Sequence, residues 1–426
     1  MNPILPLQHF VPDVEARQWQ DGRMYLYGSY DLSGGTTYCS YEYHVFSSAD
    51  LVHWEHHGES FRSTGPNSQV PWADRPLYAP DCVYRDGRYY LFFCLADNRE
   101  GVAVSPKPMG PFTHAEPVAG ADGDAIDPAA LVDEDGQVYY YWGQFHLRGA
   151  RLRPDLKGIE PGSLHNDLLT EAAHGFHEGA SIRKHDGLYY LVYTDISRGR
   201  ATCLAYATGP SPLGPFEKRD ILIDNTGCDP QTWNNHGSIA EFKGQWYLFY
   251  HRSSQASQFN RRVCIEPIHF NPDGSIDEVE MTTQGMSGPL AATQNIEAWR
   301  ACLLSGQVHT EAVQPGVTCV EYSEHLTMIH DGDWAAYKYV NFGPGVADFQ
   351  AYAASLTYGG TIELRLDRPE GLLVGVCQVP RTGGWQKWET VSCHVQGAAG
   401  LHALYLVFRG RPGRLFNLET FSFLEI

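Results

Sequence analysis

Five copies of one short pattern recur between residues 21 and 254 and restrict the folds that this chain can adopt. Each copy begins with Asp-Gly or Lys-Gly and continues with closely spaced Tyr, Leu and Phe, which predicts a tight turn followed by a β-strand. The copies occupy residues 21–31, 86–97, 135–145, 186–197 and 243–254. They start 65, 49, 51 and 57 residues apart, which leaves room for a four-stranded sheet in each repeat. The repeats therefore predict an all-β fold with a five-bladed β-propeller over residues 1–286; the alternative is a β-sandwich whose hairpins are similar by chance.

A second β domain is predicted for the remainder of the chain, because the pattern stops after the fifth copy. Residues 287–295, SGPLAATQN, are mostly small or polar and predict a linker. Residues 296–426 again alternate apolar and polar positions, as in TIELRLD, but lack the repeat. Their length suits a single β-sandwich of the jelly-roll type.

The charge balance excludes one class of partner. The chain has 50 Asp and Glu against 31 Lys and Arg, a net charge of −19. Such a surface repels a phosphate backbone, so nucleic-acid binding is not expected and an uncharged ligand such as a sugar is favoured.

Membrane insertion is not expected either, because no apolar run approaches the roughly 20 residues that a spanning helix needs. The first residues, MNPILPLQHFVPD, lack the features of a signal peptide. Cys94 and Cys264 lie within apolar strand-like runs, which predicts buried, reduced thiols. These features favour the cytoplasm, although a secreted protein whose signal has been removed would look the same.

Three carboxylates share one context. Asp13, Asp127 and Glu178 each lie about eight residues upstream of a repeated turn. In a propeller this spacing predicts an innermost strand and a side chain directed at the central axis, where a carboxylate must be hydrogen-bonded, metal-bound or functional. Three further Asp residues are predicted at turns or strand ends, with the first as the best accessory site residue: Asp81, Asp124 and Asp229.

The motifs around these carboxylates resemble glycoside hydrolase family 43 over residues 1–286. The resemblance rests on PDVEA at 12–16, AIDPA at 125–129, HEGASI at 177–182 and WNNHGSI at 233–239. The run YAPDCVYRDGRYYL resembles the second-blade motif of that family, with Tyr78 where Trp is more usual.

The resemblance implies a role for each carboxylate. Asp13 matches the general base, Glu178 the general acid, and Asp127 a third carboxylate that orients the acid and keeps it protonated by like-charge repulsion. An inverting glycosidase needs this division, with the base and the acid roughly 6.5–9.5 Å apart. These groups need no cofactor for their chemistry.

Other positions take roles only from the resemblance. His236 would lie near the axis, where a hydrated structural calcium is common. An Arg at the pocket floor would be Arg261 or Arg262, which the sequence does not separate. Aromatic side chains that could stack on a sugar, or else pack in the core, are Trp72, Tyr78, Phe145, Phe176 and Trp233.

Residues 296–426 resemble a family 6 carbohydrate-binding module, through HDGDWAAYKYVNF, GGTIELRLD, TGGWQKWET, HALYLVF and LFNLETFSF. One binding cleft of that family is matched by Trp385 and Asn417, with Met328 in place of the usual aromatic partner. Trp334 and Glu363 match the second, concave-face cleft. Glu297 and Glu419 match a structural calcium site. The alternative is a sandwich that only stabilises the propeller.

Together these features predict an exo-acting, inverting glycosidase that releases terminal α-L-arabinofuranose from plant cell-wall oligo- or polysaccharides. A β-xylosidase is the nearest alternative, because xylopyranose presents similar hydroxyls, and β-galactofuranosidase activity is another. A non-catalytic glycan-binding protein is the alternative from a different class, although a lectin has no need of an acid–base pair.

Overall fold

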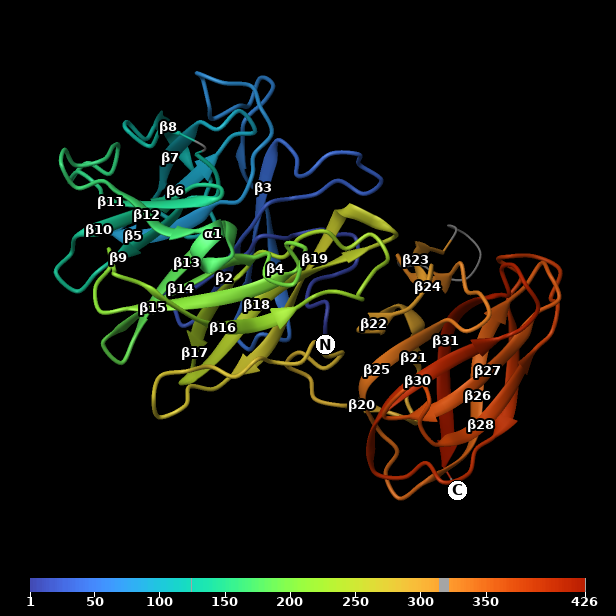
Figure 1. Ribbon diagram of the computed structural model, residues 1–426. Coiled ribbons are helices and arrows are strands. Elements are labelled where there is room, and N and C mark those ends of the chain that lie inside the picture. Colours follow the sequence, from blue (N-terminus) through green and yellow to red (C-terminus); the bar gives the residue numbers. More distant parts are fainter. Residues whose placement is uncertain (124, 314–321, 426) are drawn as a thin grey trace.

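The computed structural model describes residues 1–123, 125–313 and 322–425, and it is built almost entirely of β-strands. Two β domains follow one another along the chain (Figure 1). The first runs from blue to yellow in the figure, and the second is orange to red. The all-β prediction is confirmed.

The described residues of the first domain form five antiparallel sheets, each made of consecutive strands. The first sheet contains β1 (Glu15–Gln18), β2 (Met24–Tyr27), β3 (Glu42–Ser48) and β4 (Trp54–Arg62). The second contains β5 (Asp81–Arg85), β6 (Arg88–Cys94), β7 (Glu100–Ser105) and β8 (Thr113–Pro117). The third contains β9 (Ala129–Val132), β10 (Val138–Trp142), β11 (His146–Arg151) and β12 (His165–Thr170), and the helical turn α1 (Glu171–His174) follows it. The fourth contains β13 (Phe176–His185), β14 (Leu188–Asp195), β15 (Cys203–Gly209) and β16 (Glu217–Asp224), and the fifth β17 (Ser238–Phe242), β18 (Gln245–Ser254) and β19 (Ser257–Ile268).

Each copy of the repeated sequence pattern forms the same part of its sheet. The copy at 86–97, for example, supplies the turn between β5 and β6 and then β6 itself. Asp86 and Gly87 have φ values of 50° and 81°, the left-handed backbone that a two-residue hairpin turn of this kind requires. The aromatic residues that follow then pack in the core between sheets.

The first strands of the five sheets form a ring. β1 contacts β5 and β17, while β9 contacts β5 and β13, and β13 in turn contacts β17. Hydrogen bonds between neighbouring sheets join the ring, as where Ser238 Oγ donates to the carbonyl of Val14 at 2.8 Å. Residues at the starts of these strands therefore converge, although they are far apart in sequence.

Buried charges pair across the middle of this ring. The guanidinium of Arg17 in β1 donates to both oxygens of Asp81 in β5, at 3.1 and 2.6 Å. Arg183 in β13 donates to Glu15 at 2.6 Å. Asp81 is fully buried. The pairs hold β1 to two other sheets.

The second domain consists of two facing sheets. One contains β20 (Leu290–Ala291), β22 (Leu303–Leu304), β25 (Trp334–Asn341), β27 (Gly360–Leu366), β28 (Leu373–Val379) and β30 (Leu401–Arg409). The other contains β21 (Ile296–Glu297), β23 (His309–Ala312), β24 (Glu324–Thr327), β26 (Val346–Ala354), β29 (Glu389–His394) and β31 (Asn417–Glu425), and the short 3-10 helix η1 (Ala298–Arg300) follows β21.

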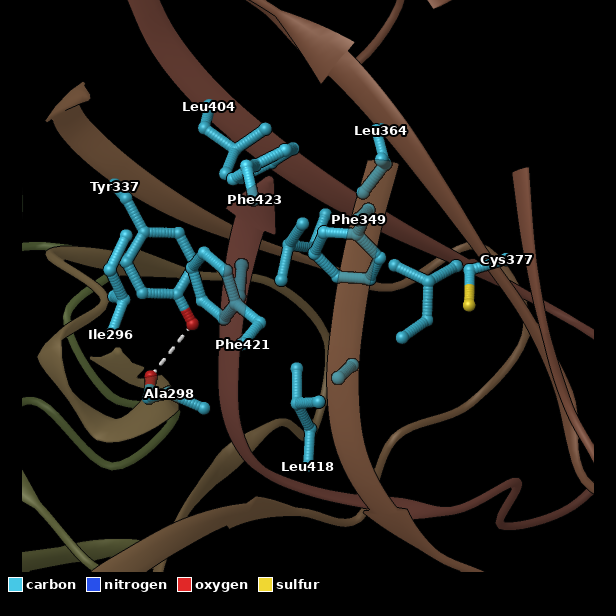
Figure 2. Close-up of a cluster of buried hydrophobic side chains, with 14 of the residues drawn as sticks. Ile296, Ala298, Tyr337, Phe349, Leu364, Cys377, Leu404, Leu418, Phe421 and Phe423 are labelled. Atoms are coloured by element: carbon cyan, nitrogen blue, oxygen red, sulfur yellow. Dashed lines mark hydrogen bonds between the residues drawn. The ribbon is translucent and has the colours of Figure 1, made fainter. Parts of the chain in front are cut away.

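The core of this sandwich lies between the two sheets (Figure 2). Phe349, Phe421 and Phe423 of one sheet meet Leu364 and Leu404 of the other. Their burial supplies the main free energy that holds the sheets together.

The predicted linker is partly a strand. Leu290 and Ala291 form β20, which pairs in parallel with the end of β25, and Leu290 is buried in the sandwich core. The buried side chains of Leu290 and Ala292 dock this segment on the sandwich, and the division of the domains at residues 287–295 stays a prediction. The backbone also joins the domains, as where the amide of Leu304 donates to the carbonyl of Gly227 at 2.6 Å.

Two further expectations concern membrane-spanning helices and the burial of cysteine thiols. Within the described residues, no helix is long and apolar enough to cross a membrane. The cysteines of the described residues are free, and all are buried except Cys393, which is half-buried.

We predict that Asp81→Asn lowers the free energy of unfolding by about 2–4 kcal/mol, because it removes the nearest counter-charge of the largely buried Arg17 side chain. Glu160→Gln is the matched control, since its ion pair with Arg151 lies at the surface and contributes at most about 1 kcal/mol. Urea unfolding of both variants measures the difference. Equal losses in the two variants would show that the Arg17 pair is not structurally important.

Candidate active site

The three predicted carboxylates line one pocket, with a volume of about 240 Å³. They approach it from three different sheets. The predicted residues Tyr78, Trp233, His236 and Arg261 line the same pocket. The other lining residues are Tyr38, Cys39, Ala79, Ile126, Gln144, His177, Ala201 and Asn234.

The backbone places two of the carboxylates just outside their strands. Asp13 and Asp127 each lie two residues before a first strand, with φ values of 57° and 56°. The prediction that they lie within innermost strands was wrong, because a left-handed residue ends the extended conformation; Asp tolerates this conformation better than most residues. The backbone amide of Asp127 donates to Cys94 Sγ at 3.3 Å.

Glu178 does lie within a first strand, at an irregularity. The register between β13 and β14 shifts on both sides of Glu178, which is typical of a bulge that redirects a side chain. Gly179 follows with φ of 69°, and a Cβ at this position would lie 2.9 Å from Thr194 Oγ1 and 3.0 Å from His236 Cγ. Only glycine therefore lets this strand approach His236 so closely.

Asp13 is held as an anion. Arg261 Nη1 donates to Asp13 Oδ1 at 2.9 Å, and Nδ1 of the buried His251 lies 3.4 Å from the same oxygen. Burial opposes the charged form, but Arg261, His251 and His236 outweigh it and hold the pKa of Asp13 far below its usual range. The carboxylate is therefore ready to accept a proton from water.

Sequence reasoning missed the residue that fixes Arg261. Asp31 accepts from Arg261 Nε and Nη2, both at 3.0 Å, and from the Arg261 backbone amide at 3.1 Å. The Arg261 guanidinium also lies 4.8 Å from the centre of the Tyr38 ring. Asp31 is the last residue of the first repeat copy, and it lies after the end of β2. A polar residue that closes the repeat was the signal that could have indicated it.

The other two carboxylates act as a pair. Burial, and then the charges of Glu178 and Asp13, raise the pKa of Asp127 well above its usual value. Gln144 Nε2 donates to Glu178 Oε2 at 2.7 Å, a second contact that the sequence did not reveal. Asp127 therefore retains its proton to a higher pH than an ordinary aspartic acid does.

His236 lies between the charged and the protonated side of the pocket. Its Nδ1 is 3.8 Å from Asp13 Oδ1 and 3.8 Å from Asp127 Oδ2. The described residues hold no cluster of three or more His, Cys, Asp or Glu arranged as metal ligands. The structure thus assigns His236 a place beside two carboxylates, and calcium there stays a prediction.

The comparisons with known proteins agree with this chemistry. Residues 1–276 match the family model "Glycosyl hydrolases family 43", and residues 306–425 match "Carbohydrate binding module (family 6)". The chain belongs to glycoside hydrolase family 43.

Individual relatives support the assignment. The arabinoxylan arabinofuranohydrolase of Bacillus subtilis is 30% identical over 100% of this chain and 92% of its own length. A crystal structure of a family 43 arabinoxylan arabinofuranohydrolase from B. subtilis with cellotetraose has a TM-score of 0.57 at 30% identity, over 100% of this chain and 97% of that chain. A β-xylosidase/α-arabinofuranosidase from a compost microbial metagenome, with xylotriose and in calcium-free form, has a TM-score of 0.57 at 30% identity, over 66% of this chain and 97% of that chain. The propeller-type fold followed by a sandwich is confirmed, and so is glycoside hydrolase activity.

Several predicted substrate contacts of this family 43 enzyme lie outside the pocket. Asp81 is committed to Arg17, and Phe176 is fully buried in the core between the third and fourth sheets. Arg262 is buried on another side of β19 and pairs with Glu324. Asp81 is therefore not the accessory pocket residue that the sequence favoured, and Phe176 takes its core-packing alternative. Of the two arginines that the sequence left open, Arg261 lines the pocket.

The remaining candidates that the structure describes do not line the pocket. Phe145 is 41% exposed beside the pocket residue His177 and does not line the pocket itself. Trp72 packs on Phe93 in a core cluster. Asp229 accepts from the backbone amide of Gln231 at 2.8 Å, as expected for a turn residue. Asp124 lies outside the described residues.

In the carbohydrate-binding module, the two residues of the first predicted cleft both contact Arg414. The Arg414 guanidinium lies 3.9 Å from the centre of the Trp385 ring. Asn417 is fully buried, donates to the Trp385 carbonyl at 2.7 Å and accepts from Arg414 at 2.8 Å. The Asn417 amide thus both donates and accepts within the module, and its contact with a sugar stays a prediction.

The other predicted positions of the module are more open. Trp334 and Glu363 are half-buried, and Glu363 pairs with Arg365 at 2.9 Å. Glu297 and Glu419 line a second groove, between the N-terminal segment and the sandwich, where Glu297 pairs with Arg300 at 2.6 Å. The calcium predicted at these two glutamates stays a prediction.

We predict that Asp127→Asn stabilises the enzyme near pH 8 while impairing catalysis. A carboxyl with a raised pKa in the folded state favours folding while it is protonated, and this contribution is lost as the pH rises through the folded-state pKa. Asparagine avoids that loss. The gain should be on the order of 1 kcal/mol or more at pH 8, since each unit of pKa shift corresponds to about 1.4 kcal/mol, and it should shrink toward pH 4.

Urea unfolding at both pH values measures this gain. Asp74→Asn, at an exposed position, serves as the control and should change nothing. A destabilised Asp127→Asn at pH 8 would contradict the electrostatic assignment.

Proposed function

We propose that this family 43 enzyme is an exo-acting, inverting hydrolase that removes terminal α-L-arabinofuranose from plant cell-wall oligo- or polysaccharides. The observation that carries the proposal is the pocket lined by an ionised Asp13, an Asp127 whose pKa is raised, and Glu178. The volume of about 240 Å³ suits one terminal sugar rather than a long chain. The names of the relatives support the choice of substrate.

The division of charge gives each group one task. Asp13 takes a proton from a water molecule as that water attacks the anomeric carbon. Glu178 gives its proton to the glycosidic oxygen as the bond from this oxygen to the anomeric carbon breaks. Water attacks from the side opposite the leaving group, so the anomeric configuration inverts. Gln144 orients Glu178 through its hydrogen bond, and Asp127 is the third carboxylate of the pocket.

A β-xylosidase activity of the same pocket is the second candidate. It is supported by the compost relative, which carries both activities in its name. Arabinofuranose and xylopyranose present similar hydroxyls, and Trp233, which is 53% exposed at the pocket, offers either sugar a stacking surface.

We also propose a structural calcium ion near His236, which the calcium-free form of that relative supports. The acid–base chemistry itself needs no such ion.

We predict that the enzyme hydrolyses p-nitrophenyl α-L-arabinofuranoside faster than p-nitrophenyl β-D-xylopyranoside. Initial rates on the two substrates, with the galactofuranoside as a third, separate the candidates. A faster rate on the xyloside would replace the first candidate by the second. Tight glycan binding without hydrolysis of any of the three would leave only a binding role.

We predict that Asp13→Asn and Glu178→Gln each lower kcat about 10²–10⁴-fold on an unactivated arabinoside, since each removes one half of the acid–base pair. Proton NMR of the first product should show an inverted anomeric centre. Asp74→Asn should leave kcat unchanged. A product with retained configuration would refute the role of Asp13 as a base, because Asp13 would then be the nucleophile.

A further inference from the structure

Arg262 lies behind the pocket wall, next to the residue that holds the base. Adjacent residues of a strand point to opposite faces, so Arg261 is directed at Asp13 while Arg262 is directed away from the pocket. Arg262 is only 3% exposed. A guanidinium buried to this degree needs a counter-charge.

The counter-charge comes from the second domain. Glu324 in β24 is fully buried and accepts from Arg262 Nη2 at 2.5 Å and from Nη1 at 3.1 Å. Gln255 Nε2 also donates to Glu324 at 2.7 Å, and the Tyr322 hydroxyl donates to it at 3.1 Å. Burial opposes ionisation, but Arg262 outweighs it and lowers the pKa of Glu324.

Arg262 in turn fixes the segment that leads to the base. Its Nη2 donates to the carbonyl of Leu7 at 2.8 Å, and its guanidinium lies 4.3 Å from the centre of the Phe10 ring. The carbonyl of Phe10 accepts from the amide of Asp31 at 2.9 Å. Asp31 is the carboxylate that fixes Arg261, and the segment ends at Asp13.

These contacts form one connected path, and we infer that Glu324 is a positioning residue for the general base. The carboxylate of the sandwich holds Arg262 against residues 7–10, and these residues set the place of Asp13 relative to Arg261. The catalytic unit therefore extends beyond the propeller into the carbohydrate-binding module. The inference rests on Asp13 acting as the base, as proposed above.

The test compares two isosteric substitutions at the domain boundary in the full-length chain. Glu324→Gln removes the charge that faces Arg262. Glu280→Gln removes a boundary charge that faces Lys338 and Tyr339 and has no contact with the segment before Asp13. Hydrogen exchange measured by mass spectrometry follows the amides of residues 7–14, and kinetics follow kcat, KM and the acid limb of the pH profile.

We expect Glu324→Gln to raise exchange in residues 7–14 and to lower kcat at least about tenfold with KM changed less than twofold, because small misplacements of a catalytic group are costly. The acid limb of kcat should move to higher pH as Arg261 loses its alignment with Asp13. Glu280→Gln should leave all of these readouts at wild-type values. Unchanged exchange in residues 7–14 would overturn the inference whatever the substrate proves to be, while an inactive wild-type enzyme would refute only the proposed function.

A double variant, Arg262→Met with Glu324→Gln, separates positioning from charge balance. It removes both charges, so that no buried ion is left without its partner. We expect stability to recover while kcat stays low, because the contact to the Leu7 carbonyl is still missing. Recovery of kcat together with stability would overturn the inference, since it would show that only an unpaired charge had been harmful.

Discussion

The buried guanidinium of Arg261 is the interaction on which the pocket depends. It is only 2% exposed and lies between two buried carboxylates, Asp13 and Asp31. Removing several charges from water costs several kcal/mol for each ion, and only close, well-directed hydrogen bonds offset this cost. Asp31 takes up two of the guanidinium nitrogens, so the remaining one can point only at Asp13. The ionised state of the base therefore follows from the geometry of a different carboxylate.

The axis of the first domain shows that a buried carboxylate has more than one way to be stabilised. Asp81 has a cation, Arg17, and is structural. Asp13 also has a cation, but it borders a pocket that water and a sugar can enter. Asp127 borders the same pocket but retains a proton, because burial and then the charges of Glu178 and Asp13 raise its pKa. The three Asp residues differ in function because their partners differ, and this is how one fold supplies both a base and an acid at the same pH.

Local patterns predicted much of this arrangement. The hairpins could be predicted because a residue pair such as Asp86-Gly87 specifies its turn without help from the rest of the chain. The three pocket carboxylates could be predicted because each precedes a turn by the same distance in sequence. Pairing across the ring could not, since Asp81 meets Arg17 from a different sheet. Arg261 and Arg262 could not be separated for a related reason: alternation shows that they face opposite ways but not which of them faces the axis.

The boundary between the domains was harder still to predict, because the repeated sequence pattern and the buried contacts place it differently. The repeated pattern has ended by residue 287, where a linker is predicted, yet Leu290 is already part of the sandwich core. A buried ion pair also joins the two domains, since the charge of Arg262 in the first domain is neutralised by Glu324 in the second. A domain whose buried cation has its counter-ion elsewhere is not complete by itself. The carbohydrate-binding module is thus tied to the propeller by the buried charge of Arg262, which pairs with Glu324.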